Sequence, residues 1–524
     1  MIRSMMPMQV RFSVVALALC LGVLVVGGYD LALSHSRYAY SADSASYVEM
    51  AQTLVTTGSM RVTPWDVEPV AIDAIPQPLF PPGFALLIAA IARVTSGIAS
   101  AALVPSRLSA ALIPCLFVLL WRPAARAGVL LGLGLWVLLT PGVRQWHYLA
   151  YSDVTMLALA IAALGLLYRG LLQRPQRTRQ GVGSPWLRAG LLAGLCYAVR
   201  NAGLAVIAAS LLTLAYAFCR QWVGWRAVTW WLTGLVGPVG GVLIYNLQTF
   251  AVLQPYLMPA STRAWQLNLA DYAREQLVDL GSPLVHSAAL ALGVMVLLFG
   301  LGGYSWWRCR AARGPDYAEH VLLTVTGSYG LCGAVLLVLS RSRYEWGTLI
   351  DARNVLQYSF VIALFLLSAV RILLPAWART VALGGSLTLL LFSATLATRD
   401  AVAAYHAPAE PWMVLSEDRA LIATIAAMPP EQLLASNAAP LLRLIAHKPV
   451  RQLDLVGEDG DLVAALRELS VVSNERRAVF FLVCDGMAQD FPMCQTRQGP
   501  PEAHCQSMRL DAPFVARCDA LSGP

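Results

Sequence analysis

Two aspartates stand where the sequence changes from polar to apolar, and both have side chains that can move a proton. Asp43 lies in the polar run 41–46, and Asp153 directly follows Tyr151 and Ser152. Each precedes an apolar pattern, so each is placed to cap the N-terminus of a helix. An ionised carboxylate in such a place can also deprotonate an acceptor hydroxyl or amine. Asp43 and Asp153 are therefore the candidate catalytic residues.

Aromatic and polar neighbours accompany both carboxylates. Tyr47, Met50, Ala51 and Leu54 follow Asp43 at helical spacing, which predicts an interfacial helix with an apolar face. Asp153 is preceded by a short loop that contains polar and aromatic residues. We expect three of these neighbours to contact the reacting molecules: Tyr47, His147 and Tyr151.

Four arginines lie at segment ends, where they would meet the membrane surface. An arginine at hydrocarbon depth is costly unless it pairs with a phosphate or a carboxylate. We therefore predict a site for the phosphate of a lipid-linked donor. A local ion pair with Asp351 or Glu345 is the alternative for the last of the four. The arginines are Arg200, Arg341, Arg343 and Arg353.

The composition indicates a membrane protein. The chain has 524 residues, of which 57% are hydrophobic and only 13% charged, and its mean hydropathy is +0.60. A soluble domain has about 25% charged residues. The net charge of +8 comes almost entirely from arginine, but it is not read as a sign of nucleic acid binding. The sequence contains no P-loop, HExxH or GxSxG motif.

Eleven apolar segments, some of them short, are expected to serve as transmembrane helices. The apolar stretch 84–98 is also short and carries Arg93, and it is expected to lie at the outer interface rather than to cross. The first segment is expected to remain as an uncleaved anchor. The expected spans are 12–30, 103–121, 128–142, 154–168, 187–200, 202–218, 227–246, 285–306, 320–340, 354–373 and 380–397.

The distribution of arginine predicts the orientation of these spans. With the N-terminus in the cytoplasm, every short inner loop is basic, as the positive-inside rule requires. Asp316 and Glu319 are the only acids expected on that side. The outer face then holds a long first loop, about 31–102, two shorter loops and the tail. Asp43 and Asp153 both fall on this outer face.

The tail changes character after residue 397. It has more charge, a strand-like run at 478–484, and helical patterns near 441–446 and 462–469. We predict a transmembrane catalytic domain over 1–397 and a small mixed α/β extracytoplasmic domain over 398–524. Four clustered cysteines in an oxidising compartment favour one or two disulfides, with a zinc site as the lesser alternative. They are Cys484, Cys494, Cys505 and Cys518.

Taken in order along the chain, several segments resemble the GT-C superfamily of polyprenyl-phosphate-sugar-dependent glycosyltransferases. The resemblance covers about residues 12–400 and is greatest for the branch with protein O-mannosyltransferases and the lipid A aminoarabinose transferase. Asn201 stands where a proline is usual, and Asn354 where a tyrosine is usual. The matching segments are Asp43 with its helix, Pro81-Pro82-Gly83-Phe84, Ser152-Asp153, Arg200-Asn201-Ala202-Gly203 and Asp351-Ala352-Arg353.

The resemblance implies a fold and a reaction. It implies a polytopic α-helical, GT-C-like protein in the bacterial inner membrane that moves a hexose or pentose from a polyprenyl-phosphate donor, with inversion. Asp43 would be the base, Asp153 would position the acceptor or a metal, and Arg353 with Arg200 would contact the lipid phosphate. No cofactor is required, although His35 and His147 in the outer loops leave a divalent metal open.

Two other functions are compatible with the sequence. An O-antigen polymerase or ligase would depend on arginines in a late loop, and the segment 341–353 fits that description. A lipid or sugar transporter would need ionisable residues within the spans and repeated halves. The spans are nearly free of acids, and we detect no internal repeat. The expected partners are therefore a lipid-linked sugar, an acceptor glycan, lipid or protein, and the membrane itself.

Overall fold

The structure is a computed structural model of residues 1–524. It describes residues 8–34, 37, 39–62, 80–95, 97–173, 183–253, 261, 263–279, 288–309, 315–343, 350, 352–373, 377–407, 415, 418–429, 433–436, 439–446, 448, 450–452, 478–484, 504–509 and 514–519.

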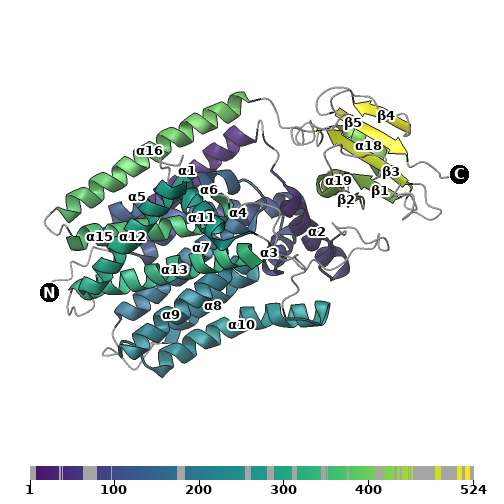
Figure 1. The fold of residues 1–524 in the computed structure, drawn as a ribbon. Helices are drawn as coiled ribbons and strands as arrows, with labels where there is room; N and C mark the ends of the chain where they lie inside the picture. Colours follow the sequence, from purple (N-terminus) through teal and green to yellow (C-terminus); the bar gives the residue numbers. More distant parts are fainter. Residues whose placement is uncertain are drawn as a thin grey trace. The chain divides into compact units, whose positions relative to one another are not determined.

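Helices make up most of the chain up to residue 406 (Figure 1). In chain order they are α1 (Met8–Leu33), α2 (Ala42–Thr57), α3 (Gly83–Ala92), α4 (Ile98–Leu120), α5 (Ala127–Leu138), α6 (Pro141–Trp146), α7 (Ser152–Leu172), α8 (Gly183–Val199), η1 (Asn201–Gly203), α9 (Leu204–Cys219), α10 (Trp225–Phe250), α11 (Trp265–Asp279), α12 (Ala288–Cys309), α13 (Pro315–Arg343), α14 (Ala352–Val355), η2 (Leu356–Tyr358), α15 (Ser359–Leu373) and α16 (Ala378–His406).

All eleven expected spans contain a helix, and eight of these helices are long and apolar enough to cross a membrane. The other three, α5, α8 and α15, have 12, 17 and 15 residues. The stretch after Pro82 forms α3, which has only ten residues and is short for a crossing. The eight long segments are 13–33, 98–120, 152–172, 201–219, 225–250, 289–309, 317–343 and 387–406.

Large apolar side chains are exposed along several of these helices. Leu24 on α1, Val236 on α10 and Val296 on α12 are 69%, 65% and 64% exposed. Exposure of this extent over long helices fits a lipid environment, where apolar surface has no cost. By contrast, α7 is buried along most of its length. Asp153 therefore begins a helix that lies inside the bundle.

Glycines allow the closest helix contacts in the bundle. A Cβ at Gly190 would lie 1.9 Å from the carbonyl oxygen of Trp231, and one at Gly234 would lie 2.1 Å from that of Leu187. Helices in membranes associate through such small residues because backbones can then approach closely. This contact joins α8 to α10, and α8 ends immediately before Arg200.

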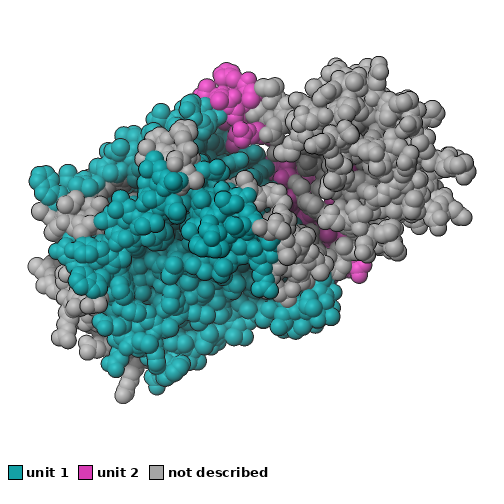
Figure 2. All heavy atoms as spheres, in the orientation of Figure 1, with its two compact units in different colours: residues 1–30, 78–87, 103–401 teal, residues 31–77, 88–102, 402–524 magenta. Residues whose placement is uncertain are grey.

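The residues divide into two compact units, shown in different colours in Figure 2. Unit 1 comprises residues 1–30, 78–87 and 103–401, and it contains Asp153, Arg200 and Arg353. Unit 2 comprises residues 31–77, 88–102 and 402–524, and it contains Asp43. The expected boundary at residue 397 falls inside α16, which continues to His406.

The tail contains a five-stranded mixed sheet. Its strands are β1 (Leu433–Ser436), β2 (Arg451–Gln452), β3 (Ala478–Cys484), β4 (His504–Arg509) and β5 (Phe514–Asp519), in the order β2-β1-β3-β5-β4. β1 is parallel to β2 and β3, whereas β5 is antiparallel to β3 and β4. Helices α18 (Arg419–Ala426) and α19 (Ala439–Ala446) share a hydrophobic core with β1 and β3. The predicted helix at 462–469 lies outside the described residues.

Candidate functional site

Asp153 is the centre of a charged cluster in unit 1. It lies in the first turn of α7 and is only 3% exposed. Arg200 donates from Nη1 to Asp153 Oδ2 at 2.7 Å and to Ser152 Oγ at 3.3 Å. Arg353 Nε lies 3.8 Å from the same Asp153 oxygen. The structure thus brings together three residues that the sequence singled out separately.

The expected capping role of Asp153 is wrong in detail. The N-cap of α7 is Tyr151, which makes no side-chain capping bond. Asp153 instead lies inside the first turn, where a carboxylate is favoured by the helix dipole. Its Oδ2 oxygen lies near both arginines. Their positive charges offset the free-energy cost of burying the carboxylate.

Two aromatic rings hold the guanidinium of Arg353. Its Cζ lies 4.9 Å from the centroid of the Tyr151 ring and 5.9 Å from that of Trp146. The two rings meet edge to face at 5.3 Å. Such cation–π contacts stabilise a guanidinium while leaving its N–H groups able to donate. The sequence did not identify Trp146, although it stands in the aromatic loop before Asp153.

Of the other two predicted arginines, Arg341 reaches this cluster and Arg343 is exposed to the surroundings. Arg341 donates to Asn354 Oδ1 at 2.9 Å, so it reaches the residue next to Arg353. Asn354, which replaces the tyrosine of the GT-C pattern, therefore serves as an acceptor for Arg341. Arg343 is exposed at the end of α13. The alternative partners considered for Arg353, Asp351 and Glu345, lie outside the described residues.

The cluster as a whole can hold an anion. Arg200 and Arg353 contribute two positive charges against the single negative charge of Asp153, and their side chains are 17% and 23% exposed. The net charge is positive, and the partial burial strengthens electrostatic attraction to a ligand. Guanidinium groups bind phosphate oxygens in a bidentate manner. A phosphate monoester or diester fits this chemistry.

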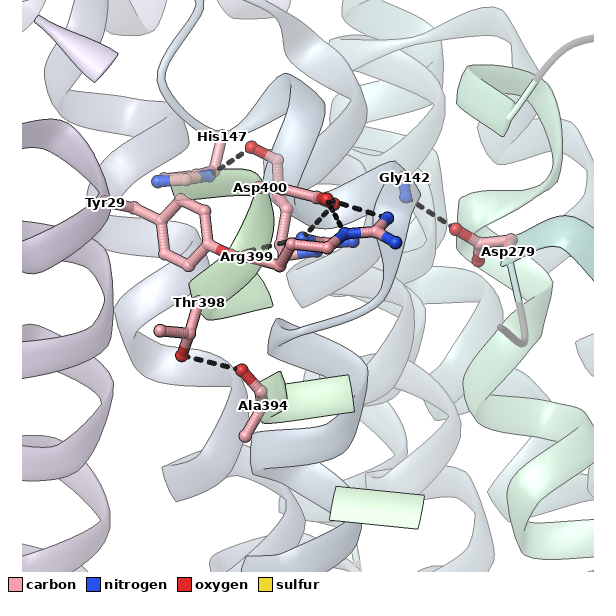
Figure 3. A network of polar contacts seen from close by, with 9 residues as sticks. Tyr29, Gly142, His147, Asp279, Ala394, Thr398, Arg399 and Asp400 are labelled. Carbon is pink, nitrogen blue, oxygen red and sulfur yellow. Dashed lines mark hydrogen bonds and ion pairs between the residues drawn. The ribbon is translucent and has the colours of Figure 1, made fainter. Parts of the chain in front are cut away.

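A second polar network supports α6, the helix that ends at Trp146. Arg144 donates to Asp400 of α16 at 2.7 Å and to the hydroxyl of Tyr29 on α1 at 3.2 Å. Figure 3 shows Asp279 approaching the start of the same helix, where its Oδ1 accepts from the Gly142 amide at 2.6 Å. The network therefore connects α6 to α1, α11 and α16.

Asp279 also connects α6 to the segment that carries Arg353. Its Oδ2 accepts a hydrogen bond from the hydroxyl of Ser359, the first residue of α15. Gln276 donates to that hydroxyl at 2.9 Å. Complete burial raises the pKa of Asp279 to about 6, against the lowering effect of these hydrogen bonds. The sequence placed Asp279 in an outer loop and missed this role.

Helical periodicity was the signal that would have located Asp279. Asn268, Tyr272, Gln276 and Asp279 recur every three or four residues and are all buried on one side of α11. The expected outer loop 247–284 contains this helix. The helix α6 begins in the last residues of the expected span 128–142 and continues into the short loop after it, and six residues are too few to show a period.

His147 does not have the position expected of an acceptor contact. It is 2% exposed, and its Nδ1 lies 3.1 and 3.0 Å from the carbonyl oxygens of Val143 and Arg144. Burial lowers the pKa of His147 to about 4, so the ring is neutral near pH 7. Its Nε2 lies 3.8 Å from Asp30, which in turn pairs with Arg107 at 3.0 Å. His147 is therefore a packing and orienting residue.

Asp43 lies in unit 2, in the first turn of α2 and partly exposed. The N-cap is Ser41, whose hydroxyl accepts from the Ser44 amide at 3.3 Å, so Asp43 is not needed as a cap. The predicted apolar face is buried, with Tyr47 and Met50 1% and 0% exposed. Tyr47 packs within this face.

Among the described residues, no three His, Cys, Asp or Glu side chains converge as they would around a metal ion. His35 lies outside the described part of the chain. In the tail, Cys505 and Cys518 occupy opposite positions of the β4–β5 pair, and Cys484 is opposite Phe514. Cys494 lies outside the described part as well.

Comparison with known proteins reveals a likeness in structure only. No protein-family model matches the chain, and no curated protein matches it in sequence. ArnT from Cupriavidus metallidurans, in a crystal structure bound to undecaprenyl phosphate, superposes with a TM-score of 0.51 at 14% identity, covering 97% of this chain and 99% of that one. Its apo form gives a TM-score of 0.51 at 17% identity, with the same coverage.

A second solved structure shares the architecture. The apo oligosaccharyltransferase of Archaeoglobus fulgidus superposes with a TM-score of 0.52 at 13% identity, covering 92% of this chain and 70% of that one. Both proteins are GT-C glycosyltransferases. The likeness extends over nearly the whole chain, so the predicted polytopic α-helical fold is confirmed: this chain has the fold of ArnT and of the archaeal oligosaccharyltransferase.

Proposed function

We propose that the chain is a membrane glycosyltransferase that moves a hexose or pentose from a polyprenyl-phosphate donor to an acceptor on the outer face of the bacterial inner membrane. The observation that carries this proposal is the convergence of Arg200 and Arg353 on Asp153 at the end of a membrane helix. Lipid-linked phosphate is an anion available at that position. The GT-C fold and the undecaprenyl phosphate bound to ArnT support the same donor class.

The proposed reaction is a single displacement. The Asp43 carboxylate takes the proton of the acceptor hydroxyl or amine while the acceptor atom bonds to the anomeric carbon. The bond from that carbon to the phosphate oxygen breaks on the opposite side, which inverts the configuration. Arg353 and Arg200 stabilise the charge that accumulates on the departing polyprenyl phosphate.

Asp153 has a different role in this proposal from the one first expected. Because its Oδ2 is directed to both arginines and its side chain is 3% exposed, we assign it to positioning the guanidinium groups rather than the acceptor. Tyr151 and Trp146 assist through the contacts of their rings with the Arg353 guanidinium. The proposal places the N-terminus in the cytoplasm and the tail in the periplasm.

The phosphate site is tested by the affinity for undecaprenyl phosphate, measured by native mass spectrometry on the detergent-solubilised full chain. Hydrogen bonds to charged groups contribute about 1.5–3 kcal/mol, so Arg353→Gln is expected to weaken binding roughly ten- to hundredfold. Arg226→Gln, at the exposed start of α10, is the matched control and should bind normally. Equal affinity in wild type and Arg353→Gln would refute the phosphate assignment.

The catalytic base is tested by Asp43→Asn in membranes supplied with radiolabelled polyprenyl-phosphate hexoses and pentoses. A general base contributes about 10²–10⁴-fold to rate, so transfer should fall by that factor while undecaprenyl phosphate affinity is unchanged. Asp316→Asn, at the opposite side of the membrane in the proposed orientation, is the control. Full transfer by Asp43→Asn would remove the base assignment. Sugar transfer that fails only when Arg341 or Arg343 is changed would favour the polymerase or ligase alternative.

A further inference from the structure

Arg443 is a buried cation in the tail. It belongs to α19, is 6% exposed, and burial lowers the pKa of its guanidinium. Arginine is almost never this buried unless it is paired. The acid that opposes this lowering is Glu49 of α2, whose Oε2 lies 3.9 Å from Arg443 Nε. Both residues belong to unit 2.

The helix that carries Arg443 is firmly anchored in the tail. Ala439, Leu442 and Ala446 of α19 are buried in one hydrophobic cluster with Phe481 of β3. The helix α19 also packs against α2. Segments 42–57 and 439–446, which are far apart in the sequence, are therefore neighbours, and the ion pair lies where they meet.

The position of Glu49 on α2 gives this contact a consequence for Asp43. The two residues are six apart, so they are separated by about 9 Å along the helix axis and by about 120° around it. Asp43 shares the side of Tyr47 and Met50, whereas Glu49 faces α19. A contact at Glu49 therefore restrains the rotation of α2 about its own axis without occupying the side on which Asp43 lies.

We propose that Arg443 and Glu49 are positioning residues through which the C-terminal domain holds α2 and so orients Asp43. The C-terminal domain then acts in catalysis as the support of the first-loop helix. The part of the proposal that concerns rate rests on the proposed function of Asp43 as a base. The part that concerns the attachment of α2 does not.

Hydrogen–deuterium exchange of the full chain tests the attachment. In Arg443→Met, the amides of residues 42–57 are expected to exchange at least about tenfold faster, because a buried ion pair that loses one partner is strongly destabilised. Arg419→Met changes an exposed arginine of the same domain and should leave exchange of these amides unchanged. If Arg443→Met does not fold, Glu49→Gln removes the pair from the other side. Unchanged exchange of 42–57 in the folded variant would overturn the proposal.

Kinetics test the positioning role. Arg443→Met should lower kcat for sugar transfer about tenfold or more, with KM for the lipid-linked donor unchanged and with partial recovery in Arg443→Lys. An equal loss in Arg443→Met and Arg443→Lys, or a rise in donor KM alone, would overturn the positioning role. Failure of the base assignment would appear separately, as full transfer by Asp43→Asn, and would leave the exchange result standing.

Discussion

Asp153, Arg200 and Arg353 illustrate what can be inferred from single residues. Each stood out in the sequence because a charged side chain interrupts apolar surroundings, which is costly in a membrane. Their pairing could not be inferred, because Arg200 follows the end of α8 and Arg353 lies on a short segment far along the chain. Asp279 and Trp146 were missed for the same reason, since their importance lies in what they touch.

The raised pKa of Asp279 leads to a prediction about how the stability of the chain depends on pH. Its pKa in the folded chain is about 6, above the ordinary value of 3.8, so its contribution to stability is fully present below pH 3.8 and is lost as pH rises through 6. Asp279→Asn removes this dependence. The unfolding midpoint of Asp279→Asn minus that of the wild type should therefore increase as the pH is raised from 4 to 7.

The contribution of His147 to stability changes with pH in the opposite direction, over an overlapping pH range. Its folded pKa of about 4 lies below the ordinary 6.5, so its contribution is present above pH 6.5 and is lost as pH falls through 4. The comparison between variant and wild type isolates Asp279, because His147 is common to both. A difference in midpoint that is constant from pH 4 to pH 7 would contradict the buried, protonated state of Asp279.

At the scale of elements, sequence patterns located the strongly apolar helices well and missed the six-residue α6 and the amphipathic α11. Every expected span contains a helix, and the strand-like run 478–484 is β3. The two missed elements, α6 and α11, are those that connect the networks around Asp153 and Asp279. α11 is amphipathic and packs on α12 and α13, so tertiary burial, and not hydropathy, decides its conformation.

The register of the β4–β5 pair leads to a prediction about disulfide pairing in the tail. Opposite residues in an antiparallel pair have Cα atoms about 4.5–5.5 Å apart, which is within the range of about 4.4–6.8 Å that a disulfide requires. Because Cys505 is opposite Cys518, we predict a disulfide between them. Mass spectrometry of unreduced peptides from the periplasmically folded chain should find this linkage, and Cys505→Ser should abolish it. A linkage of Cys505 to another cysteine would show that the register does not determine the pairing.

At the scale of the whole molecule, the charge pattern predicts the orientation of the chain in its membrane. Eleven crossings with basic inner loops place the N-terminus inside and the tail outside. The structure describes eight helices that meet the length and hydropathy of a span, and the shorter α5, α8 and α15 lie in the other three expected spans. The orientation remains a prediction about the chain in its membrane.

Reporter fusions test this orientation. Alkaline phosphatase, which is active only outside the cytoplasm, should be active when fused after Pro524 and inactive when fused after Arg177. A fluorescent protein that folds only in the cytoplasm should give the reverse pattern. Equal alkaline phosphatase activity at both sites would mean an odd number of errors in the spans between them. The reverse pattern, activity after Arg177 and none after Pro524, would mean an error before Arg177, with α3 the first segment to reconsider.

Sequence patterns were enough to predict the membrane environment, the approximate helices, and the acids and arginines expected on the outer face. These follow from local terms, because hydropathy and the cost of a charge in lipid depend on each segment alone. Only the tertiary structure decided that Arg200 and Arg353 share one carboxylate, that Asp279 joins α6 to α15, and that Arg443 reaches Glu49. Those contacts join segments that are far apart in the chain, so no single segment encodes their geometry.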